Sequence, residues 1–410
     1  MVSLKQRCCL SASTRDNDRV DTGDGTDSGE DDREDDRDGE DRAAGPRHAL
    51  AGVGGGGANL PVLRGHNTAL LLGLLRTAGP DGTGRRELAA ASGLTPQAIS
   101  KITARLRSEG LVAETARRPS TGGKPATPLR LVPGAAHAVG VHMERDGLTA
   151  VLVDLYGTVV AERRTPLDLG AGTGVVLDAV TDTVTALRAR LAPAAAPLGA
   201  GVALPGPLDH RTGVPRRITG FPEWDGFPLR TALRRRLGTP VVVGEDTDAA
   251  ALGLALAGAD GTSFAYLHLG TGLGAGLVLD GRVLRGAGEF GHQVVQLDGP
   301  PCGCGDRGCL EAVCLAALAR GDTAGAARVL GTGAANLAGL LGVRAVVLGG
   351  RAVRDAPGVY VRGVREALGA RAARTGDPDD VPVRTVPGGD RHVAEGAAQL
   401  LLAPLFGRGG

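Results

Sequence analysis

Four side chains in the run GEFGHQVVQLDGPPCGCGDRGCLE have the types and spacing of metal ligands. His292, Cys302, Cys304 and Cys309 follow the pattern H-x9-C-x-C-x4-C. One imidazole and three thiolates complete a tetrahedral zinc shell with no open position, which is typical of a structural site. A disulfide pair, or chance cysteines in a glycine-rich loop, is the alternative. Because three of the six cysteines fall close together behind a histidine, the sequence predicts one structural Zn²⁺ per chain.

The chain that must position these ligands is long enough for two or three domains. It has 410 residues, of which 42% are hydrophobic and only 2% aromatic, so its cores must be built from Ala, Val and Leu. No stretch approaches the ~20 apolar residues that a membrane span needs. The charged N-terminus lacks the apolar run of a signal peptide. Free cysteines beside a metal motif suit a reducing cytoplasm, where we expect the protein.

Charge divides the chain into three parts. Residues 1–60 hold 14 acidic and 8 basic side chains, residues 61–133 hold 4 acidic and 11 basic ones, and the remainder is balanced. The first part has few apolar residues, so we expect a disordered acidic tail and linker. It is either a solvated tail or the product of a start codon placed too far upstream. The basic part, 61–133, is predicted to bind DNA, and 134–410 to form an effector domain.

The basic part has the pattern of a winged helix-turn-helix. An apolar helical face around Leu70–Leu75 precedes a turn, and a short helix ends near Gly93. Thr95 is a good N-cap for a recognition helix ending at Ser108. A plain helical hairpin is the alternative. Short strands begin at Leu111 and at Leu129, and the Gly/Pro-rich basic loop between them is typical of a wing.

Six polar side chains in this region are candidate DNA contacts, and the protein is expected to bind as a homodimer to an inverted repeat. Three on the recognition helix are candidates for base or phosphate contact: Gln97, Ser100 and Lys101. Three basic ones are candidates for phosphate contact: Arg105, Arg118 and Lys124.

From about Ala136 the pattern alternates between strands and helices. Strands are expected in AHAVGVHMER, in the two halves of GLTAVLVDLYGTVVAERR, in LGAGVALPGPL, TPVVVGED and FAYLHLGTGLGAGLVLDGRVL, and in VRAVVLGG. Helices are expected in VVLDAVTDTVTALRARL, DAAALGLALAG and GAAQLLLAPLF. Two similar halves, each opening on strand-turn-strand, indicate an α/β fold.

Several short motifs resemble those of the ROK family (repressors, open reading frames, kinases). They are GEFGH and GCLE around the metal ligands, the RxHN-like word Arg64–Asn67, and GGKPAT in the wing. The resemblance covers residues 61–405 and implies a two-lobed ribonuclease-H-like core, as in sugar kinases, Hsp70 and actin. The family contains both sugar kinases and sugar-responsive transcription factors.

The resemblance also identifies the regions that contact nucleotide in the kinases. Their first loop carries an acidic residue and a DxGGT-like run; here His142 takes the acidic position, and Glu144–Asp146 stand about where Gly-Gly-Thr would. A bulky charged loop cannot wrap a triphosphate, and its acids repel one. The second, glycine-rich loop is intact and forms a vestigial nucleotide loop, and Val347–Gly350 fits the third region, although plain structure explains both equally well. The residues of the vestigial loop are Gly270, Thr271, Gly272 and Gly274.

The sugar side of the family's site is better kept. Asp246 matches the kinase aspartate that accepts the sugar hydroxyl proton, and is here a vestigial catalytic candidate. Glu289 and His292 match residues that hydrogen-bond sugar hydroxyls, with Glu311 a further candidate. A helix N-cap is the alternative for Asp246, and a surface carboxylate for Glu289. The family's usual Asn in a PNLPGW-like word aligns with Gly220.

These observations favour a sequence-specific DNA-binding regulator, a repressor that responds to a sugar or sugar derivative and is not an enzyme. An ATP-dependent ROK sugar kinase with an added DNA-binding domain is the alternative. A regulator that has lost ligand binding and responds to a protein partner is a third possibility. The altered first phosphate loop separates the regulator from the kinase.

Overall fold

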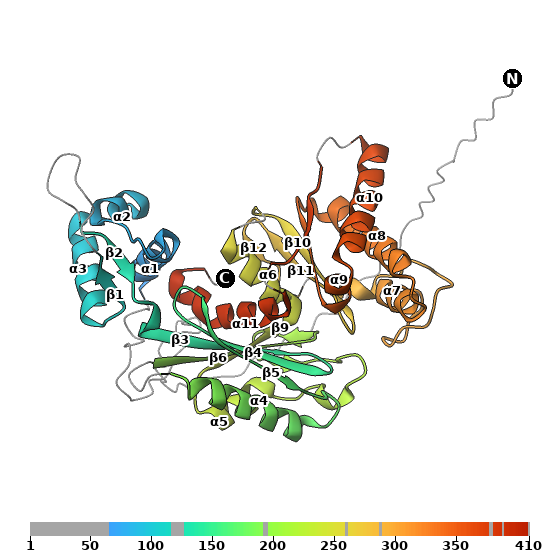
Figure 1. Cartoon of the computed structure of the whole chain (residues 1–410), viewed down its shortest axis with the longest axis horizontal. Helices are drawn as coiled ribbons and strands as arrows, with labels where there is room; N and C mark the ends of the chain where they lie inside the picture. Colours follow the sequence, from blue (N-terminus) through green and yellow to red (C-terminus); the bar gives the residue numbers. More distant parts are fainter. Residues whose placement is uncertain are drawn as a thin grey trace, which may run out of the picture. The chain divides into compact units, whose positions relative to one another are not determined.

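A computed structural model describes residues 65–115, 127–191, 196–258, 261–286, 289–376, 380–387 and 389–408 (Figure 1). The predicted acidic tail and linker therefore lie outside the described residues, as do Arg64 and most of the predicted wing, with Arg118 and Lys124. All described residues belong to one compact unit, so the predicted boundary at 133–134 stays a prediction.

Three helices and a two-stranded sheet come first. They are α1 (His66–Ala78), α2 (Arg85–Ser92), α3 (Pro96–Ser108), β1 (Val112–Glu114) and β2 (Leu129–Leu131). The Thr95 hydroxyl accepts the Ala98 N–H at 3.2 Å and caps α3, and Gly93 ends α2 with a φ of 68°. Helices and short strands lie where the sequence predicted them, while the winged helix-turn-helix as a DNA-binding unit stays a prediction.

The first lobe contains a five-stranded sheet in the order β5-β4-β3-β6-β9. Its strands are β3 (Ala136–Met143), β4 (Gly147–Val153), β5 (Val159–Pro166), β6 (Ala196–Leu204) and β9 (Val241–Glu245). One face is covered by α4 (Thr173–Arg188) and α5 (Leu229–Leu237), and a short antiparallel pair, β7 (Leu208–Asp209) and β8 (Val214–Pro215), follows β6. All five strands and α4 agree with the predictions from sequence.

The second lobe repeats this topology, with sheet order β12-β11-β10-β13-β14. In both sheets the first three strands of the chain form an antiparallel meander, and the last two add in parallel. The strands are β10 (Phe264–Leu269), β11 (Leu273–Leu279), β12 (Arg282–Val283), β13 (Val346–Gly349) and β14 (Val383–Thr385). The predicted pair of similar halves is thus confirmed.

Four helices of the second lobe were not predicted from sequence. They are α7 (Leu310–Ala319), α8 (Thr323–Leu341), α9 (Arg351–Asp355) and α10 (Pro357–Thr375). The long pair α8 and α10 pack closely because glycines face each other: a Cβ on Gly331 would lie 2.8 Å from the Gly363 carbonyl oxygen. Short 3-10 turns complete the chain: Pro133–Ala135, Pro222–Trp224, Phe290–His292, Gly389–Arg391 and Ala403–Phe406.

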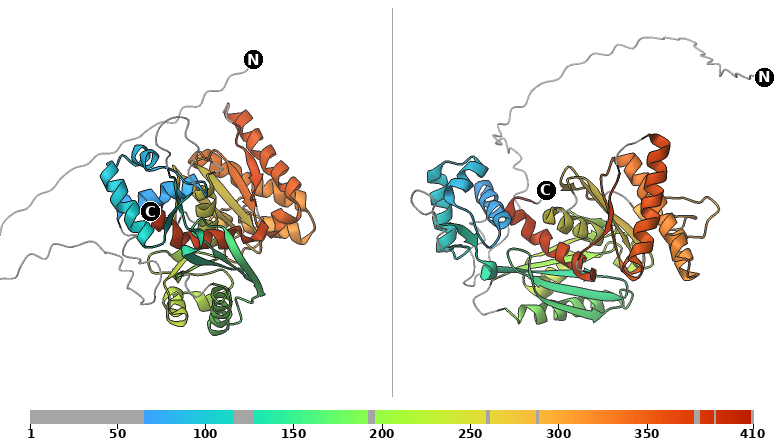
Figure 2. Two further views of the ribbon diagram at one scale, coloured as in Figure 1. Left: turned by 60° about the vertical axis from the view of Figure 1, so that its left-hand side comes forward. Right: turned by 45° about the horizontal axis from the view of Figure 1, so that its top comes forward.

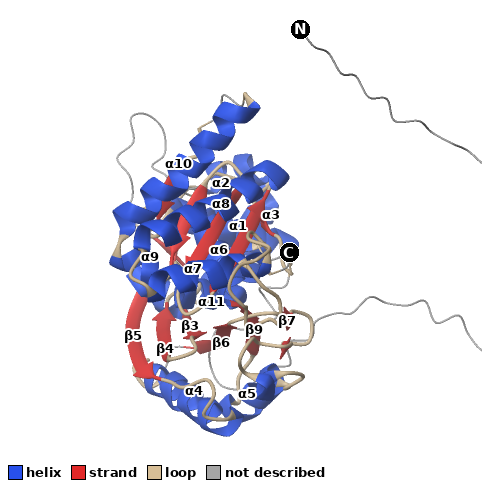
Figure 3. Ribbon diagram, turned by 90° about the vertical axis from the view of Figure 1, so that its right-hand side faces the viewer, coloured by secondary structure: helices blue, strands red, loops and turns tan. Residues whose placement is uncertain are grey.

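Two helices lie between the sheets, α6 (Asp246–Ala257) and α11 (His392–Leu402) (Figure 3). α11 packs on the first sheet over two glycines, since a Cβ on Gly140 or Gly201 would lie within 2 Å of a carbonyl oxygen of α11. Gly396 makes the same close approach to α6. These small residues place the N-terminus of α6 at the carboxyl ends of the first-lobe strands.

The helical unit, formed by α1, α2, α3, β1 and β2, is joined to the core through α1 and α11 (Figure 2). Leu71, Leu72 and Leu75 of α1 share one buried cluster with Leu402 and Phe406. Arg76 of α1 donates to the Tyr156 carbonyl oxygen and to Gln399 of α11, at 3.1 and 3.0 Å. Among the described helices, none is both long and apolar enough to cross a membrane.

Candidate ligand pocket and metal centre

A cavity of about 210 Å³ lies between the lobes, where β3, β6 and β9 end. The carboxyl ends of strands are the usual place for ligands in open α/β sheets. Pockets for drug-sized ligands measure about 300–1,000 Å³, so this one suits a smaller molecule. The sequence-predicted sugar residues Asp246, Glu289, His292 and Glu311 all line it, together with the glycine loop Gly270–Gly274.

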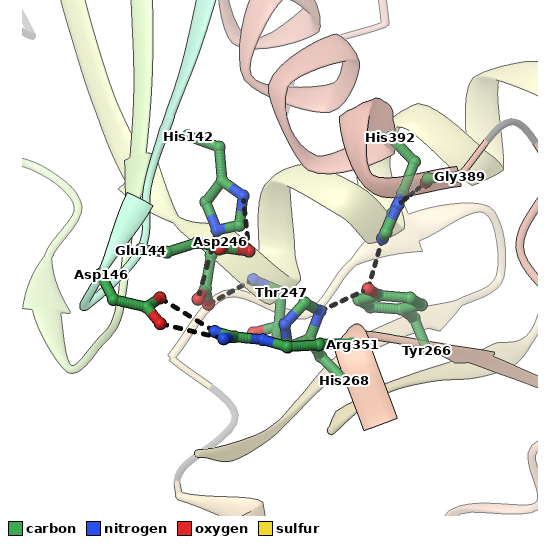
Figure 4. A network of polar contacts seen from close by, with 10 residues as sticks. All are labelled: His142, Glu144, Asp146, Asp246, Thr247, Tyr266, His268, Arg351, Gly389 and His392. Atoms are coloured by element: carbon green, nitrogen blue, oxygen red, sulfur yellow. Dashed lines mark hydrogen bonds and ion pairs between the residues drawn. The ribbon is translucent and has the colours of Figure 1, made fainter. Parts of the chain in front are cut away.

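Asp246 begins α6 directly after β9. One carboxylate oxygen accepts the Thr247 N–H at 2.7 Å, and the other lies 3.9 Å from Nε2 of the buried His142 (Figure 4). Burial alone would raise the pKa of Asp246, but the His142 imidazole and the charge of His268 outweigh it, so the net shift is downward. Asp246 is therefore an anionic hydrogen-bond acceptor. The predicted N-cap alternative is not borne out, because Glu245 holds the N-cap position.

The other three predicted sugar contacts differ in how many of their polar atoms already have a partner within the protein. Glu289 is exposed at the rim. Glu311 accepts the Leu273 N–H at 2.7 Å, so one of its oxygens anchors the glycine loop. His292 has Nδ1 3.4 Å from Cys302 Sγ, so a bound metal ion would take that nitrogen and leave Nε2 for a pocket ligand.

The turn at the position of the first phosphate loop is held by a hydrogen bond of its own and by an ion pair to the second lobe. Glu144, Arg145 and Asp146 join β3 to β4, and the Glu144 N–H donates to the Gly147 carbonyl oxygen at 2.8 Å. Asp146 accepts two hydrogen bonds from Arg351, both of 2.9 Å, and these bonds hold the pKa of Asp146 below its ordinary value. Arg351 begins α9 in the second lobe, so this pair bridges the cleft (Figure 4).

The glycine-rich loop is explained by packing. A Cβ on Gly276 would lie 2.1 Å from the Thr247 carbonyl oxygen, and one on Gly274 would lie 2.9 Å from the Thr247 side chain. Thr271 lines the pocket beside Gly270 and Gly272. These glycines let β11 approach α6 closely, so the loop alone does not demonstrate a nucleotide site.

A row of hydrogen-bonded tyrosine and histidine side chains extends away from the pocket. The Tyr266 hydroxyl is 2.7 Å from His268 Nδ1 and 2.5 Å from His392 Nε2, and His392 Nδ1 is 2.8 Å from the Gly389 carbonyl oxygen (Figure 4). His268 lines the pocket, whereas His392 is the first residue of α11. This row therefore connects the pocket to the helix that contacts α1.

The four predicted metal ligands converge. Their ligand atoms all lie within 4.8 Å of one another, with Cys304 Sγ 3.7 Å from Cys309 Sγ. A disulfide needs about 2.05 Å, so the disulfide alternative is wrong for these cysteines, which are free. A tetrahedral ion with Zn–S bonds of 2.3 Å would separate sulfurs by about 3.8 Å and sulfur from nitrogen by about 3.5 Å. The group has the geometry of a metal site.

Local backbone structure builds this metal loop. The Cys302 N–H donates to the Asp306 carbonyl oxygen at 2.8 Å and Gly305 N–H to the Cys302 carbonyl oxygen at 3.1 Å, which forms a tight turn. Cys309 is the N-cap of α7 and is fully buried, and burial raises its pKa to about 12. A bound cation would hold it as the thiolate. Glu311 lies in the first turn of α7, so the metal loop also positions the glycine loop.

The candidate DNA contacts on α3 are divided by their side-chain partners. Gln97, Ser100 and Lys101 are exposed on one face of the helix. Arg105 donates to the Thr68 hydroxyl of α1 at 2.8 Å, so this side chain joins two helices.

Some pocket residues were not predicted from sequence. Arg145 and Glu245 line the cavity as well, and the Arg145 guanidinium lies over the Phe221 ring at 5.4 Å. Gly220, at the position of the family's Asn, has a φ of 89°, and a Cβ there would lie 3.9 Å from the Arg145 guanidinium. Glu245 adjoins Asp246, a signal that the sequence offered; the placement of Arg145 depends on tertiary contacts.

Comparison with known proteins agrees with this architecture. The family model described as ROK family matches residues 138–321. The N-acetylglucosamine repressor of Escherichia coli O6:H1 is 30% identical over 266 residues, which are 62% of this chain and 64% of that protein. The chain thus matches a little less than two thirds of the length of this curated relative.

Two solved structures resemble this one. A ROK family transcriptional regulator, a homologue of the E. coli MLC protein, has a TM-score of 0.67 at 24% identity, over 83% of this chain and 96% of that one. The ROK hexokinase of Thermus thermophilus has a TM-score of 0.54 at 30% identity, over 66% of this chain and 98% of that one. The first likeness shows the fold, and the second extends over nearly the whole hexokinase. With the family match, the likeness to the hexokinase establishes that this chain belongs to the ROK family.

Proposed function

We propose that this protein is a DNA-binding transcriptional repressor whose ROK core binds a small sugar or sugar derivative. The carrying observation is the turn Glu144–Asp146. By the resemblance, these charged side chains stand about where ROK kinases have their first phosphate loop, and Arg351 of the second lobe hydrogen-bonds Asp146 of this turn. Phosphoryl transfer depends almost wholly on positioning and charge stabilisation of the phosphates, so this turn disfavours the kinase reaction.

The pocket supports a polyhydroxylated ligand. Five carboxylates line it, which repel phosphate groups and suit the vicinal hydroxyls of an unphosphorylated sugar: Glu144, Glu245, Asp246, Glu289 and Glu311. The similarity to an N-acetylglucosamine repressor supports a sugar effector of the same broad class. A ligand that fills the cleft contacts both lobes, so it would favour one closure angle between them. It shifts DNA affinity only by its differential affinity for the two states, typically ~1–3 kcal/mol.

Zinc is the ion proposed for the group formed by His292, Cys302, Cys304 and Cys309. Three soft thiolates and one imidazole at near-tetrahedral separations favour Zn²⁺ over the harder cations. With no ligand position left open, its role is structural. It would hold the start of α7, and through Glu311 the glycine loop beside the pocket.

The α3 surface supports DNA binding by a homodimer at an inverted repeat. Gln97, Ser100 and Lys101 face outward together, as a recognition helix in the major groove requires. Arg105 supports DNA binding in two ways: its charge attracts phosphate, and its hydrogen bond to Thr68 holds α3 against α1. Arg118 and Lys124, outside the described residues, remain proposed phosphate contacts of the wing.

A ROK sugar kinase is the second candidate, favoured by the ionised Asp246 in the pocket and by the similarity to a hexokinase. The deciding experiment incubates the purified protein with ATP, Mg²⁺ and a panel of hexoses, pentoses and amino sugars. We expect binding of a sugar without turnover. Phosphorylation at ~1–100 per second, the range of ordinary kinases, would overturn the regulator.

The DNA-binding role is tested first by genomic selection of bound DNA and then with Lys101→Ala. If Lys101 contacts a phosphate, affinity falls at all sequences and the salt slope decreases by about one unit. Arg107→Ala is the matched control, because Arg107 is paired with Glu114 at 3.0 Å. No specific DNA in the selection, or a footprint on one asymmetric half-site, contradicts this proposal.

A further inference from the structure

We propose a second metal site, formed by His210, Glu245 and Asp248, that binds a divalent transition-metal cation such as Zn²⁺ or Mn²⁺. It is separate from the cysteine centre and does not depend on the proposed regulatory function. The three ligand atoms lie within 4.8 Å of one another. They come from three elements that meet where β9 ends and α6 begins.

The distances between these groups are those of metal ligands. His210 Nε2 lies 3.6 Å from Glu245 Oε1 and 3.5 Å from Asp248 Oδ2. Charge-assisted hydrogen bonds between an imidazolium and carboxylates measure about 2.7–2.9 Å, so both separations are too long for such bonds. Nitrogen and oxygen ligands at 2.0–2.2 Å around a tetrahedral ion are about 3.3–3.6 Å apart. An ion between the three atoms would satisfy all of them at once.

Burial makes an empty site costly. Asp248 is only 5% exposed, and its Oδ2 has no hydrogen-bond partner. His210 Nε2 is also buried without one. Buried polar groups in proteins are normally satisfied, and an unpaired one indicates a missing ion or water. The two unpartnered atoms lie 3.5 Å apart.

The surrounding structure fixes the ligands in advance. Glu245 is held by the Leu208 N–H at 3.2 Å and by close packing on Gly206, where a Cβ would lie 2.7 Å from its carboxyl carbon. Asp248 lies in the first turn of α6, and His210 in the turn between β7 and β8. Such support keeps a metal-binding side chain in place without the ion.

The charge balance also calls for a cation. The ligand oxygens of Glu245 and of the buried Asp248 lie within 4.8 Å of each other, so two carboxylates meet in one place. A divalent ion would neutralise both carboxylates. One imidazole with two carboxylates is a mixed nitrogen and oxygen set, which suits Zn²⁺ or Mn²⁺ and lacks the sulfur ligands of the cysteine centre. Because Glu245 also lines the ligand pocket, the ion would lie at the pocket wall.

The test counts ions in the full chain. We expect wild-type protein to bind two Zn²⁺ per chain, and the Cys304→Ala variant to keep one with only nitrogen and oxygen ligands by X-ray absorption. His210→Ala should keep the cysteine-bound ion and lose the second. Asp248→Asn should weaken the second by more than the ~10–100-fold that loss of an outer-shell partner costs. Glu223→Gln, an exposed carboxylate of the same lobe, is the control and should leave both ions bound.

Titration of Cys304→Ala with Mn²⁺, followed by electron paramagnetic resonance, gives an independent measurement. Saturable binding of one Mn²⁺ that is abolished by adding His210→Gln supports the site. The proposal is overturned if wild-type protein binds only the cysteine-bound ion, or if His210→Ala and His210→Gln keep the second ion with unchanged affinity. The number of Zn²⁺ ions bound per wild-type chain is decisive by itself, so the test does not depend on any variant that fails to fold.

Discussion

At the scale of single residues, the pocket contains a charged acceptor without the neighbours of a phosphoryl-transfer site. Asp246, the proposed sugar contact, lines the pocket, and the imidazole of His142 helps to hold it ionised. The Asp246 carboxylate can therefore accept a hydrogen bond from a sugar hydroxyl.

The first prediction concerns Asp246→Asn. A hydrogen bond to a charged group contributes about 1.5–3 kcal/mol, so the change should weaken sugar binding by about 10- to 100-fold. Isothermal titration of the sugar found in the panel measures the change. Glu223→Gln should bind that sugar as the wild type does. Unchanged affinity in Asp246→Asn would remove Asp246 from the binding site.

At the scale of elements, the metal loop and α7 act together. Cys309 occupies the N-cap position of α7, and Glu311 in the first turn accepts the Leu273 N–H. The candidate metal ligand and the residue that anchors the glycine loop are therefore two positions apart at the start of one helix. The loop has few apolar side chains, so a bound cation would be the main source of its order.

The second prediction follows from this connection. Cys304→Ala should lose the cysteine-bound Zn²⁺, increase hydrogen exchange across 293–311, and weaken sugar binding through Glu311. Elemental analysis and hydrogen exchange give the two readouts. Cys314→Ala is a matched control, because that buried thiol lies outside the ligand group and contacts the Ala326 carbonyl oxygen. Freshly purified protein without zinc would refute the metal assignment; sugar binding retained in Cys304→Ala would refute only the connection.

At the scale of the whole molecule, the cleft between the lobes is bridged by one bidentate ion pair, and α11 links the pocket to the helical unit. The pair Asp146–Arg351 is partly exposed, so its contribution to global stability is small, about 0–1 kcal/mol. The pair matters more for lobe closure than for global stability, because it connects the two lobes that a bound ligand must also connect.

The third prediction is that Asp146→Asn favours an open cleft, seen as a larger radius of gyration in X-ray scattering and faster sugar release. Arg351 lowers the pKa of Asp146 below its ordinary 3.8. The pair therefore stabilises the closed form at every pH above that value and is lost only as pH falls through the lowered pKa. The Asp146→Arg, Arg351→Asp double variant should restore closure. An unaltered cleft in Asp146→Asn would contradict the bridging role.

The fourth prediction is that Arg76 transmits the state of the core to the DNA-binding helices. Its guanidinium bonds Tyr156 and Gln399 and lies over the Phe406 ring at 4.7 Å, and burial lowers its pKa to about 10. Arg76→Ala should keep operator binding but reduce the change in DNA affinity on adding sugar. Arg85→Ala, whose partner Glu114 lies within the helical unit, is the control. A full sugar response in Arg76→Ala would exclude this path.

The sequence determined by itself what depends on short stretches of chain. The metal ligands lie within eighteen residues, so their spacing alone predicts the site. The strands of the first sheet, β10, β11 and β13 of the second, α4, α6 and the capped helix α3 follow from hydrophobic period and from residues such as Thr95. The family motifs pointed to the sugar-side carboxylates, and the pocket contains them.

Tertiary structure decided what depends on distant residues. Asp146 and Arg351 are 205 positions apart, and no local pattern pairs them. His210 meets Glu245 and Asp248 only because β9 ends beside the turn after β7. Helices α8 and α10 are rich in glycine, which disfavours helix in isolation; they form because those glycines allow close packing against each other. Such contacts arise from the packing of whole elements, which sequence spacing does not encode.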